Sequence, residues 1–234
     1  MHLIGNGILI TRNAVEPLIF NGAVVVKNNT IIDYGKTSDM RETYKDARFT
    51  DVKAKLIMPG LLNTHMHIYS AFARGMILED GKTSKNFSQV LENLWWRLDR
   101  TLTLEDVKYS AYATYIDSIK NGVTTVFDHH ASQNAIEASL FTIKDVAQDL
   151  GIRTSLCYEV TDRDGKEATK KGIKENIDFI KYANDDKSDM VKGMFGLHAS
   201  FTVSDDTLEA CASQIQGLDA GFHVHTAEGI DDLY

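Results

Sequence analysis

The sequence has little of what disulfide-rich, nucleic-acid-binding or membrane-spanning proteins need. Its 234 residues contain two cysteines, Cys157 and Cys211, and no CxxC pair, so neither a disulfide framework nor a thiolate zinc site is predicted. The net charge of −8 is opposite in sign to the basic surface of a nucleic-acid binder. No stretch of the sequence approaches the roughly 18 consecutive apolar residues of a membrane span. The N-terminus has neither a basic leader nor an apolar core of the length found in signal peptides. We therefore expect a cytoplasmic protein that binds no nucleic acid and no membrane.

The chain is predicted to contain two domains of different character. Residues 1–55 are β-rich: residues 7–11 form a short apolar run, and residues 23–34 (AVVVKNNTIIDY) predict a hairpin. Asn28 and Asn29 would occupy its turn, because asparagine tolerates the positive φ of tight hairpins. From residue 56 to residue 234 the pattern changes, and short apolar runs alternate with longer helical ones. We expect this second segment to be a separate domain.

The alternation in residues 56–234 predicts repeated strand–helix–strand units. The expected strands are 56–62, 123–127, 154–160, 192–197 and 221–224, and the expected helices are 87–98, 104–121, 135–150, 166–183 and 204–215. Thr103 and Ser204 stand at N-cap positions, and Gly122 and Gly151 directly follow helix ends, as helix boundaries require. Units of this kind build a parallel sheet with helices outside it.

Such a parallel sheet can have one of two arrangements, an open doubly wound sheet or a closed (β/α)8 barrel. An open sheet that binds a dinucleotide would carry GxGxxG after its first strand, and this sequence has no such motif. A barrel is consistent with the pattern, although only about five of its eight strands are visible. We therefore expect an α/β fold, with part of a TIM-type barrel.

Two histidines, His65 and His67, lie at the end of the first predicted barrel strand. Residues i and i+2 of a strand face the same way, about 6.6 Å apart, so both imidazoles can bind one ion at about 2.0–2.1 Å. The C-terminal ends of barrel strands are also where such enzymes place their active sites. A single HxH is common in ordinary strands, so it does not identify a metal site by itself.

A second histidine pair strengthens the prediction. The sequence 221–228, GFHVHTAE, ends the fifth predicted strand with another HxH and adds Glu228 three residues after His225. A strand-end histidine followed by a carboxylate suits a metal ligand and a proton shuttle for a metal-activated water. Two such clusters at strand ends predict a metal-dependent hydrolase.

Four segments of this chain resemble the amidohydrolase superfamily, and in particular its deaminase and chlorohydrolase branch. They are MPGLLNTHMH (58–67), GVTTVFDHH (122–130), GLHASFTVS (196–204) and FHVHTAE (222–228). The resemblance implies a (β/α)8 TIM-type metallo-dependent hydrolase barrel, with residues 1–55 as the N-terminal portion of an accessory β-sandwich. The sixth-strand histidine of that family and its eighth-strand aspartate, which is a metal ligand, would lie outside these 234 residues, so this chain alone is expected to be inactive.

The resemblance also implies roles for individual residues. His65, His67 and His225 would bind one divalent metal ion, zinc first and iron as the alternative, with Glu228 as catalytic proton shuttle. His198 would act in catalysis and contact the substrate. No suitable lysine lies beside His198, which favours one metal over two.

The expected reaction is hydrolytic deamination of an aminated heterocycle of the purine, pyrimidine, pterin or triazine kind. Hydrolysis of an amide C–N or a C–Cl bond at the same site is an alternative, and a truncated, non-catalytic metal-binding chain is another. The expected partner is a small-molecule substrate, and the resemblance is consistent with a homodimer.

Other polar and aromatic residues allow more than one interpretation. His129 is expected at the pocket mouth as a substrate contact, with Asp128 beside it as a structural carboxylate. Trp95 either closes over the substrate or packs in the core, and His223 is expected inside the barrel rather than on the metal. Glu159 and the turn at 162–165 end the third strand, and we expect a solvated charged turn there rather than a substrate contact.

Overall fold

The computed structural model describes residues 1–76 and 83–230 and divides into two compact units, Met1–Gly60 and Leu61–Tyr234. Each unit has its own buried apolar clusters. Among the described residues, none of the helices is long and apolar enough to cross a membrane.

The first unit is a five-stranded sheet with one helix. Its elements are β1 (His2–Ile10), β2 (Leu18–Lys27), β3 (Thr30–Lys36), α1 (Thr37–Thr43), β4 (Arg48–Asp51) and β5 (Leu56–Ile57). The order is β3-β2-β1-β4, and β5 also pairs with β1. The predicted hairpin is confirmed, since β2 and β3 are antiparallel and Asn28 at the turn has a φ of 58°.

The prediction of one strand over residues 56–62 is wrong, because two separate strands cover this segment. Residues Leu56–Ile57 pair with β1, and a new strand, β6 (Leu61–Met66), begins after Pro59 and Gly60. Proline has no backbone N–H to donate to a sheet and is excluded from strand interiors. The division of the sequence between the two compact units follows Gly60.

The second unit is a partial barrel of parallel strands. After β6 come β7 (Val123–His130), β8 (Arg153–Tyr158), β9 (Val191–Gly193), β10 (Phe195–Ala199) and β11 (Phe222–His225). Strands β6 to β9 pair in sequence order, β10 pairs with β11, and a bridge between Val160 and Leu197 joins the two sheets. The predicted fourth strand is thus split into β9 and β10.

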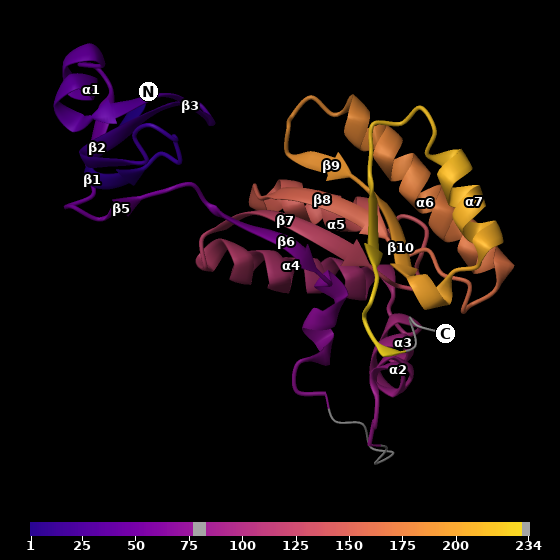
Figure 1. Ribbon diagram of the computed structural model, residues 1–234. Helices are drawn as coiled ribbons and strands as arrows, with labels where there is room; N and C mark the ends of the chain where they lie inside the picture. Colours follow the sequence, from indigo (N-terminus) through magenta and orange to yellow (C-terminus); the bar gives the residue numbers. More distant parts are fainter. Residues whose placement is uncertain (77–82, 231–234) are drawn as a thin grey trace. The chain divides into compact units, whose positions relative to one another are not determined.

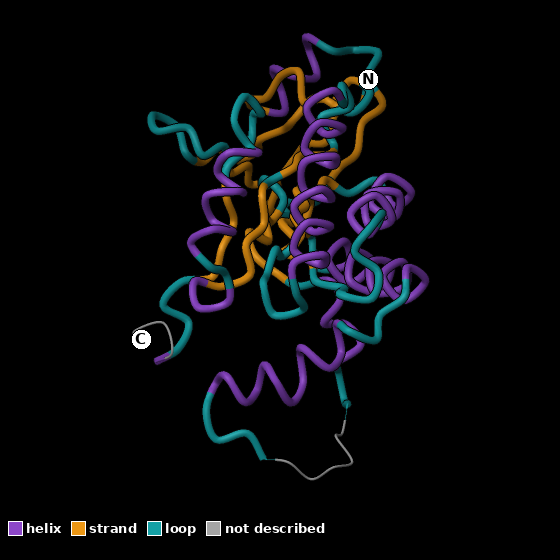
Figure 2. The backbone as a smooth tube through the Cα atoms, turned by 90° about the vertical axis from the view of Figure 1, so that its right-hand side faces the viewer, coloured by secondary structure: helices purple, strands orange, loops and turns teal. Residues whose placement is uncertain are grey.

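Four of the described helices cover the outside of these strands (Figure 1): α4 (Leu104–Lys120), α5 (Ser139–Leu150), α6 (Lys166–Asp185) and α7 (Asp205–Gln214). Figure 2 gives a second view of the backbone, with helices in purple and strands in orange. The α4 cap is as predicted: Asp106 N donates to Thr103 Oγ1 over 3.3 Å, and Thr103 N donates to Asp106 Oδ2 over 2.8 Å. Gly151 ends α5 with a left-handed φ of 70°, a conformation that glycine adopts without strain.

The helix expected over 87–98 is interrupted. It consists of α2 (Phe87–Val90), a π-helical turn (Leu91–Trp95) and α3 (Trp96–Asp99). A π turn inserts a residue into the helical ladder and is often found at functional sites. This segment lies in the connection between β6 and β7, the first βα connection of the barrel.

Candidate active site

The C-terminal ends of the barrel strands bring together a set of imidazoles and one carboxylate. They are His65 and His67 from the end of β6, His129 from β7, Glu159 just after β8, His198 from β10, and His223 and His225 from β11. Parallel strands place their carboxyl ends at one edge, so residues far apart in the sequence meet there.

The three histidines expected to bind a metal are mutually adjacent. The ring centroids of His65 and His67, and of His65 and His225, are 5.0 Å apart, and those of His67 and His225 are 5.1 Å apart. The Nε2 atoms of His65 and His225 are separated by 3.3 Å. Two nitrogens bound tetrahedrally to one zinc ion at about 2.0–2.1 Å would be about 3.3–3.4 Å apart. The spacing therefore suits a shared cation.

The other ring nitrogen of each of these histidines has a partner. His67 Nδ1 donates to the carbonyl of His129 over 2.7 Å, and His225 Nδ1 donates to the carbonyl of His198 over 2.7 Å. His65 Nδ1 lies 2.9 Å from His223 Nε2. Such contacts fix the tautomer and orientation of metal-binding imidazoles and leave Nε2 as the ligand atom. The side chains present thus fit a divalent cation.

Glu159 is the site residue whose position the sequence did not predict. It is not part of a solvated turn: only 1% of its surface is exposed. Its Oε1 lies 3.0 Å from His67 Nδ1 and 3.3 Å from His129 Nδ1, and its Oε2 lies 3.6 Å from His198 Nε2. Burial opposes ionisation, but the surrounding imidazoles outweigh it and hold the pKa of Glu159 well below its ordinary value. The carboxylate is therefore charged.

Burial and the Glu159 carboxylate act in opposite directions on the pKa values of the histidines. Burial alone would lower the pKa of His67, but the adjacent Glu159 carboxylate raises that pKa to about 9. Burial and the neighbouring imidazoles lower the pKa of His65 to about 4. His198 is also buried, which lowers its pKa to about 4. His65 and His198 are therefore neutral at pH 7.

A cavity of about 200 Å³ opens beside these histidines. Its lining includes His67, Tyr69, Phe87, Leu91, Trp95, Glu159, His198, His225 and Glu228. The predicted catalytic residues Glu228 and His198 thus share one cavity with Trp95, which comes from the π turn. The lining combines flat apolar rings with a few polar groups, as small-molecule sites do.

His129 does not lie at a pocket mouth, as the sequence suggested. Its side chain is fully buried, and its ring stacks on that of His223 with centroids 4.5 Å apart and a 10° interplanar angle. Two groups of side chains have possible ligand atoms within 4.8 Å of one another: His67, His129, Glu159 and His225 form the first, and His65, His129 and His223 form the second. The expected structural role of Asp128 is confirmed, because its Oδ1 accepts a 2.6 Å hydrogen bond from Ile68 N.

The turn at 162–165 is built into the protein rather than solvated. The Arg163 side chain is 7% exposed and pairs with Asp99, which is 1% exposed. Arg100 Nε donates to Asp164 Oδ1 over 2.7 Å, and the Arg163 guanidinium lies 5.1 Å from the centre of the Trp96 ring. These contacts tie the segment that carries Trp95 to the loop after β8. No local pattern in one sequence could have indicated this pairing.

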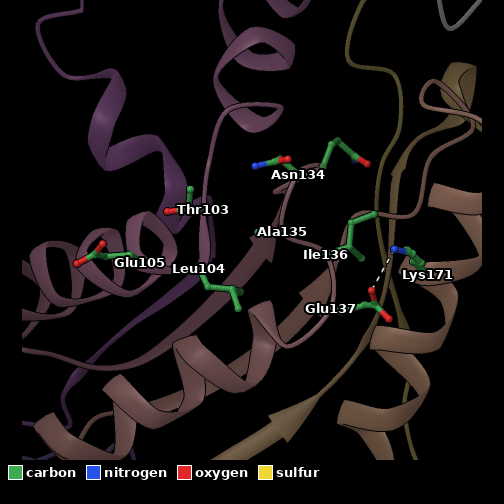
Figure 3. Close-up of a pocket in the computed structure, with 9 residues that line it drawn as sticks. Thr103, Leu104, Glu105, Asn134, Ala135, Ile136, Glu137 and Lys171 are labelled. Atoms are coloured by element: carbon green, nitrogen blue, oxygen red, sulfur yellow. Dashed lines mark ion pairs between the residues drawn. The ribbon is translucent and has the colours of Figure 1, made fainter.

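A larger, more open hollow lies away from the histidines, between the first turn of α4 and the loop after β7. Its volume is about 660 Å³, and it is lined by Thr103, Leu104, Glu105, Gln133, Asn134, Ala135, Ile136, Glu137 and Lys171 (Figure 3). Glu137 and Lys171 pair across it at 3.0 Å. It contains no cluster of imidazoles and carboxylates, so the smaller cavity is the candidate active site.

Comparison with known proteins agrees with the fold and the histidine cluster. The sequence profile described as "Amidohydrolase family" matches residues 56–234. The chain belongs to the amidohydrolase family. It is 30% identical over 230 residues to the 5'-deoxyadenosine deaminase of Methanobrevibacter smithii, an alignment that covers 95% of this chain and 49% of that protein. This amidohydrolase chain thus spans about half the length of the curated relatives it matches.

Solved structures show the same fold at low sequence identity. Triazine hydrolase from Arthrobacter aurescens superposes with a TM-score of 0.78 at 21% identity, covering 97% of this chain and 52% of that chain. An adenosine deaminase from Xanthomonas campestris with bound zinc gives a TM-score of 0.73 at 22% identity, covering 96% of this chain and 48% of that chain. The partial TIM-type barrel predicted from the sequence is therefore confirmed as the amidohydrolase fold.

Proposed function

We propose that the protein containing this chain is a metal-dependent aminohydrolase, which removes an amino group from a nitrogen heterocycle by hydrolysis. The observation that carries the proposal is the convergence of His65, His67 and His225 beside a cavity that also holds His198 and Glu228. Membership of the amidohydrolase family supports it. The names of the relatives, which are deaminases of adenosine-type compounds, support a purine-like substrate.

We assign His65, His67 and His225 as ligands of one divalent cation, with zinc preferred over iron. When bound there, zinc would lower the pKa of a coordinated water toward about 7 and so provide a nucleophile at neutral pH. The protein holds the two Nδ1–H groups of His67 and His225 on backbone carbonyls, so their Nε2 atoms are oriented before any cation arrives.

The other residues of the cavity act on the substrate. Glu228 would take up the two protons that the attacking water gives up and deliver one to a ring nitrogen and one to the departing amine, which is the task of a positioned carboxyl group. His198, neutral and held by a 2.7 Å contact between its Nδ1 and Thr202 Oγ1, would orient the ring. Trp95 offers a flat apolar surface against which a heterocycle can stack.

Ammonia release tests this proposal. The zinc-loaded protein would be incubated with a panel of adenosine-type nucleosides, aminopyrimidines, aminopterins and aminotriazines. His67→Ala should lose both bound zinc and turnover, whereas His2→Ala, which removes an imidazole from the first unit, should lose neither. If the complete zinc-loaded protein that contains this chain released no ammonia from any of these compounds, the assignment as an aminohydrolase would be contradicted.

A further inference from the structure

We infer that Glu159 is a positioning residue for the cation site: its carboxylate holds the His67 imidazole through Nδ1 and so directs Nε2 at the cation. The inference rests on the proposed function and deepens it, because it names a residue that acts on the cation through a ligand. Its Oε1 lies 3.0 Å from His67 Nδ1.

The surroundings of Glu159 show what compensates its charge. A buried carboxylate needs charged or hydrogen-bonding partners, since leaving it unpaired costs several kcal/mol. Within the described part of the chain, its ion-pair partners are all histidines: His67, His129 and His198. A divalent cation bound by histidines beside it would supply the positive charge that no lysine or arginine supplies.

Glu159 lies with His67, His129 and His225 in a group of possible ligand atoms within 4.8 Å of one another, and the side of His67 that it contacts favours positioning over direct ligation. Glu159 Oε1 lies 3.0 Å from His67 Nδ1, and the N–H of that nitrogen donates to the carbonyl of His129 over 2.7 Å. The lone pair left for a metal is therefore on Nε2, on the other side of the ring. A carboxylate in this place forms a carboxylate–histidine–metal triad, which fixes the ring and raises the basicity of the ligand.

Glu159 also distinguishes His67 from the other two proposed ligands. The Nδ1 of His225 meets a neutral backbone carbonyl, and the Nδ1 of His65 meets the imidazole of His223. His67 is thus the one of the three that contacts a charged acceptor through Nδ1. We expect His67 to be the strongest electron-pair donor to the cation. We also expect the contribution of His67 to the cation affinity to depend on the charge of Glu159.

Zinc affinity measures this role directly and independently of turnover. Parent, Glu159→Gln and Glu175→Gln proteins would be titrated with zinc against a chromophoric chelator. Glu159→Gln should bind zinc about 10–100-fold more weakly, the usual cost of removing such a partner. Glu175 is a matched control: it is also buried, at 5% exposure, but accepts from Ala138 N over 2.9 Å and Leu140 N over 3.0 Å. Its variant should keep the parent zinc affinity.

Cobalt substitution separates a positioning residue from a ligand. If Glu159 positions His67, the visible spectrum of the Co²⁺-loaded Glu159→Gln variant should keep the band positions and intensity of the parent, with only the affinity reduced. A change of coordination number in that spectrum would overturn the positioning role, as would an affinity loss below about threefold, well short of the expected range.

A second variant covers the case in which Glu159→Gln does not fold, judged by circular dichroism. Glu159→Asp keeps the charge and shortens the side chain, so its zinc affinity should fall, with the cobalt bands again unchanged. Parent affinity in this variant would contradict the inference. A parent protein that binds no zinc at all would instead contradict the proposed function, so the two failures are distinguishable.

Discussion

Replacing Arg163 by methionine should destabilise the second unit by about 3–5 kcal/mol, the usual cost of removing one partner from a buried ion pair. The Arg163 and Asp99 side chains are 7% and 1% exposed, so neither can turn to water when the other is lost. Methionine retains much of the apolar stem that packs near Trp96. The decrease in the free energy of unfolding would therefore come from the unpaired buried carboxyl of Asp99 and not from a cavity.

The pH dependence of that loss has a defined sign. Burial raises the pKa of Asp99 to about 7 even with the guanidinium beside it. Without Arg163, this carboxyl would keep a folded-state pKa far above its unfolded value of about 3.9. The folded variant then binds more protons than the unfolded chain between those values, and its stability falls as the pH rises through that window. The cost of Arg163→Met should thus be larger at pH 8 than at pH 6.

Urea unfolding followed by tryptophan fluorescence would measure these differences, since the Trp96 ring lies 5.1 Å from the Arg163 guanidinium. The control is Arg74→Met, whose partner is Asp117 in a pair with side chains 66% and 52% exposed; such pairs contribute about 0–1 kcal/mol. The double variant Asp99→Leu/Arg163→Met should recover most of the lost stability, because an apolar pair leaves no buried charge. If Arg163→Met cost no more than Arg74→Met, the reasoning would be refuted.

Three further predictions concern local structure. Thr103→Ala should lower stability by about 0.5–2 kcal/mol through loss of the α4 cap, and an unchanged melting temperature would contradict it. Gly196→Ala would place a Cβ 2.2 Å from the carbonyl oxygen of Tyr158, so thermal unfolding should show a loss of about 1–3 kcal/mol or more; parent-like stability would show that the strand can shift. Asp162 accepts from Ser204 N over 2.7 Å; burial opposes its charge, but this and other hydrogen bonds lower its pKa. The difference in the free energy of unfolding between parent and Asp162→Asn should therefore be largest near pH 6. It should decrease below about pH 4, where the carboxyl protonates first in the unfolded chain and then in the folded one. A difference that does not change with pH would argue against this.

The order of elements in the second unit was predictable because its signals are local. Helix α4 begins and ends where its capping threonine and following glycine indicated, and β7 and β8 lie where the apolar runs predicted. The failures have local causes too: Pro59 divides one expected strand, and the π turn at Leu91–Trp95 interrupts one expected helix. Neither event changes the hydrophobic pattern, so periodicity could not reveal it.

The residues of the candidate site likewise fall into those that the sequence could predict and those that it could not. His65, His67 and His225 were predictable because alternate strand residues share a face and strand ends meet at one edge. Glu159 was not, because its environment is made by side chains from β6, β7 and β10, which are distant in the sequence. The pairing of Asp99 with Arg163 likewise joins the loops after two different strands. A charged residue in a turn is solvated or buried according to neighbours that its own segment does not specify.

The acceptors that hold His67 and His225 are main-chain carbonyls, those of His129 and His198 on the neighbouring strands. A substitution at residue 129 or 198 changes a side chain but leaves its carbonyl in the sheet. The pairing of the strands therefore fixes the orientation of these two imidazoles. Side-chain substitutions on the neighbouring strands should leave that orientation unchanged. Pocket side chains can diversify toward new substrates while the histidine geometry persists, which makes this edge of the barrel an evolvable one.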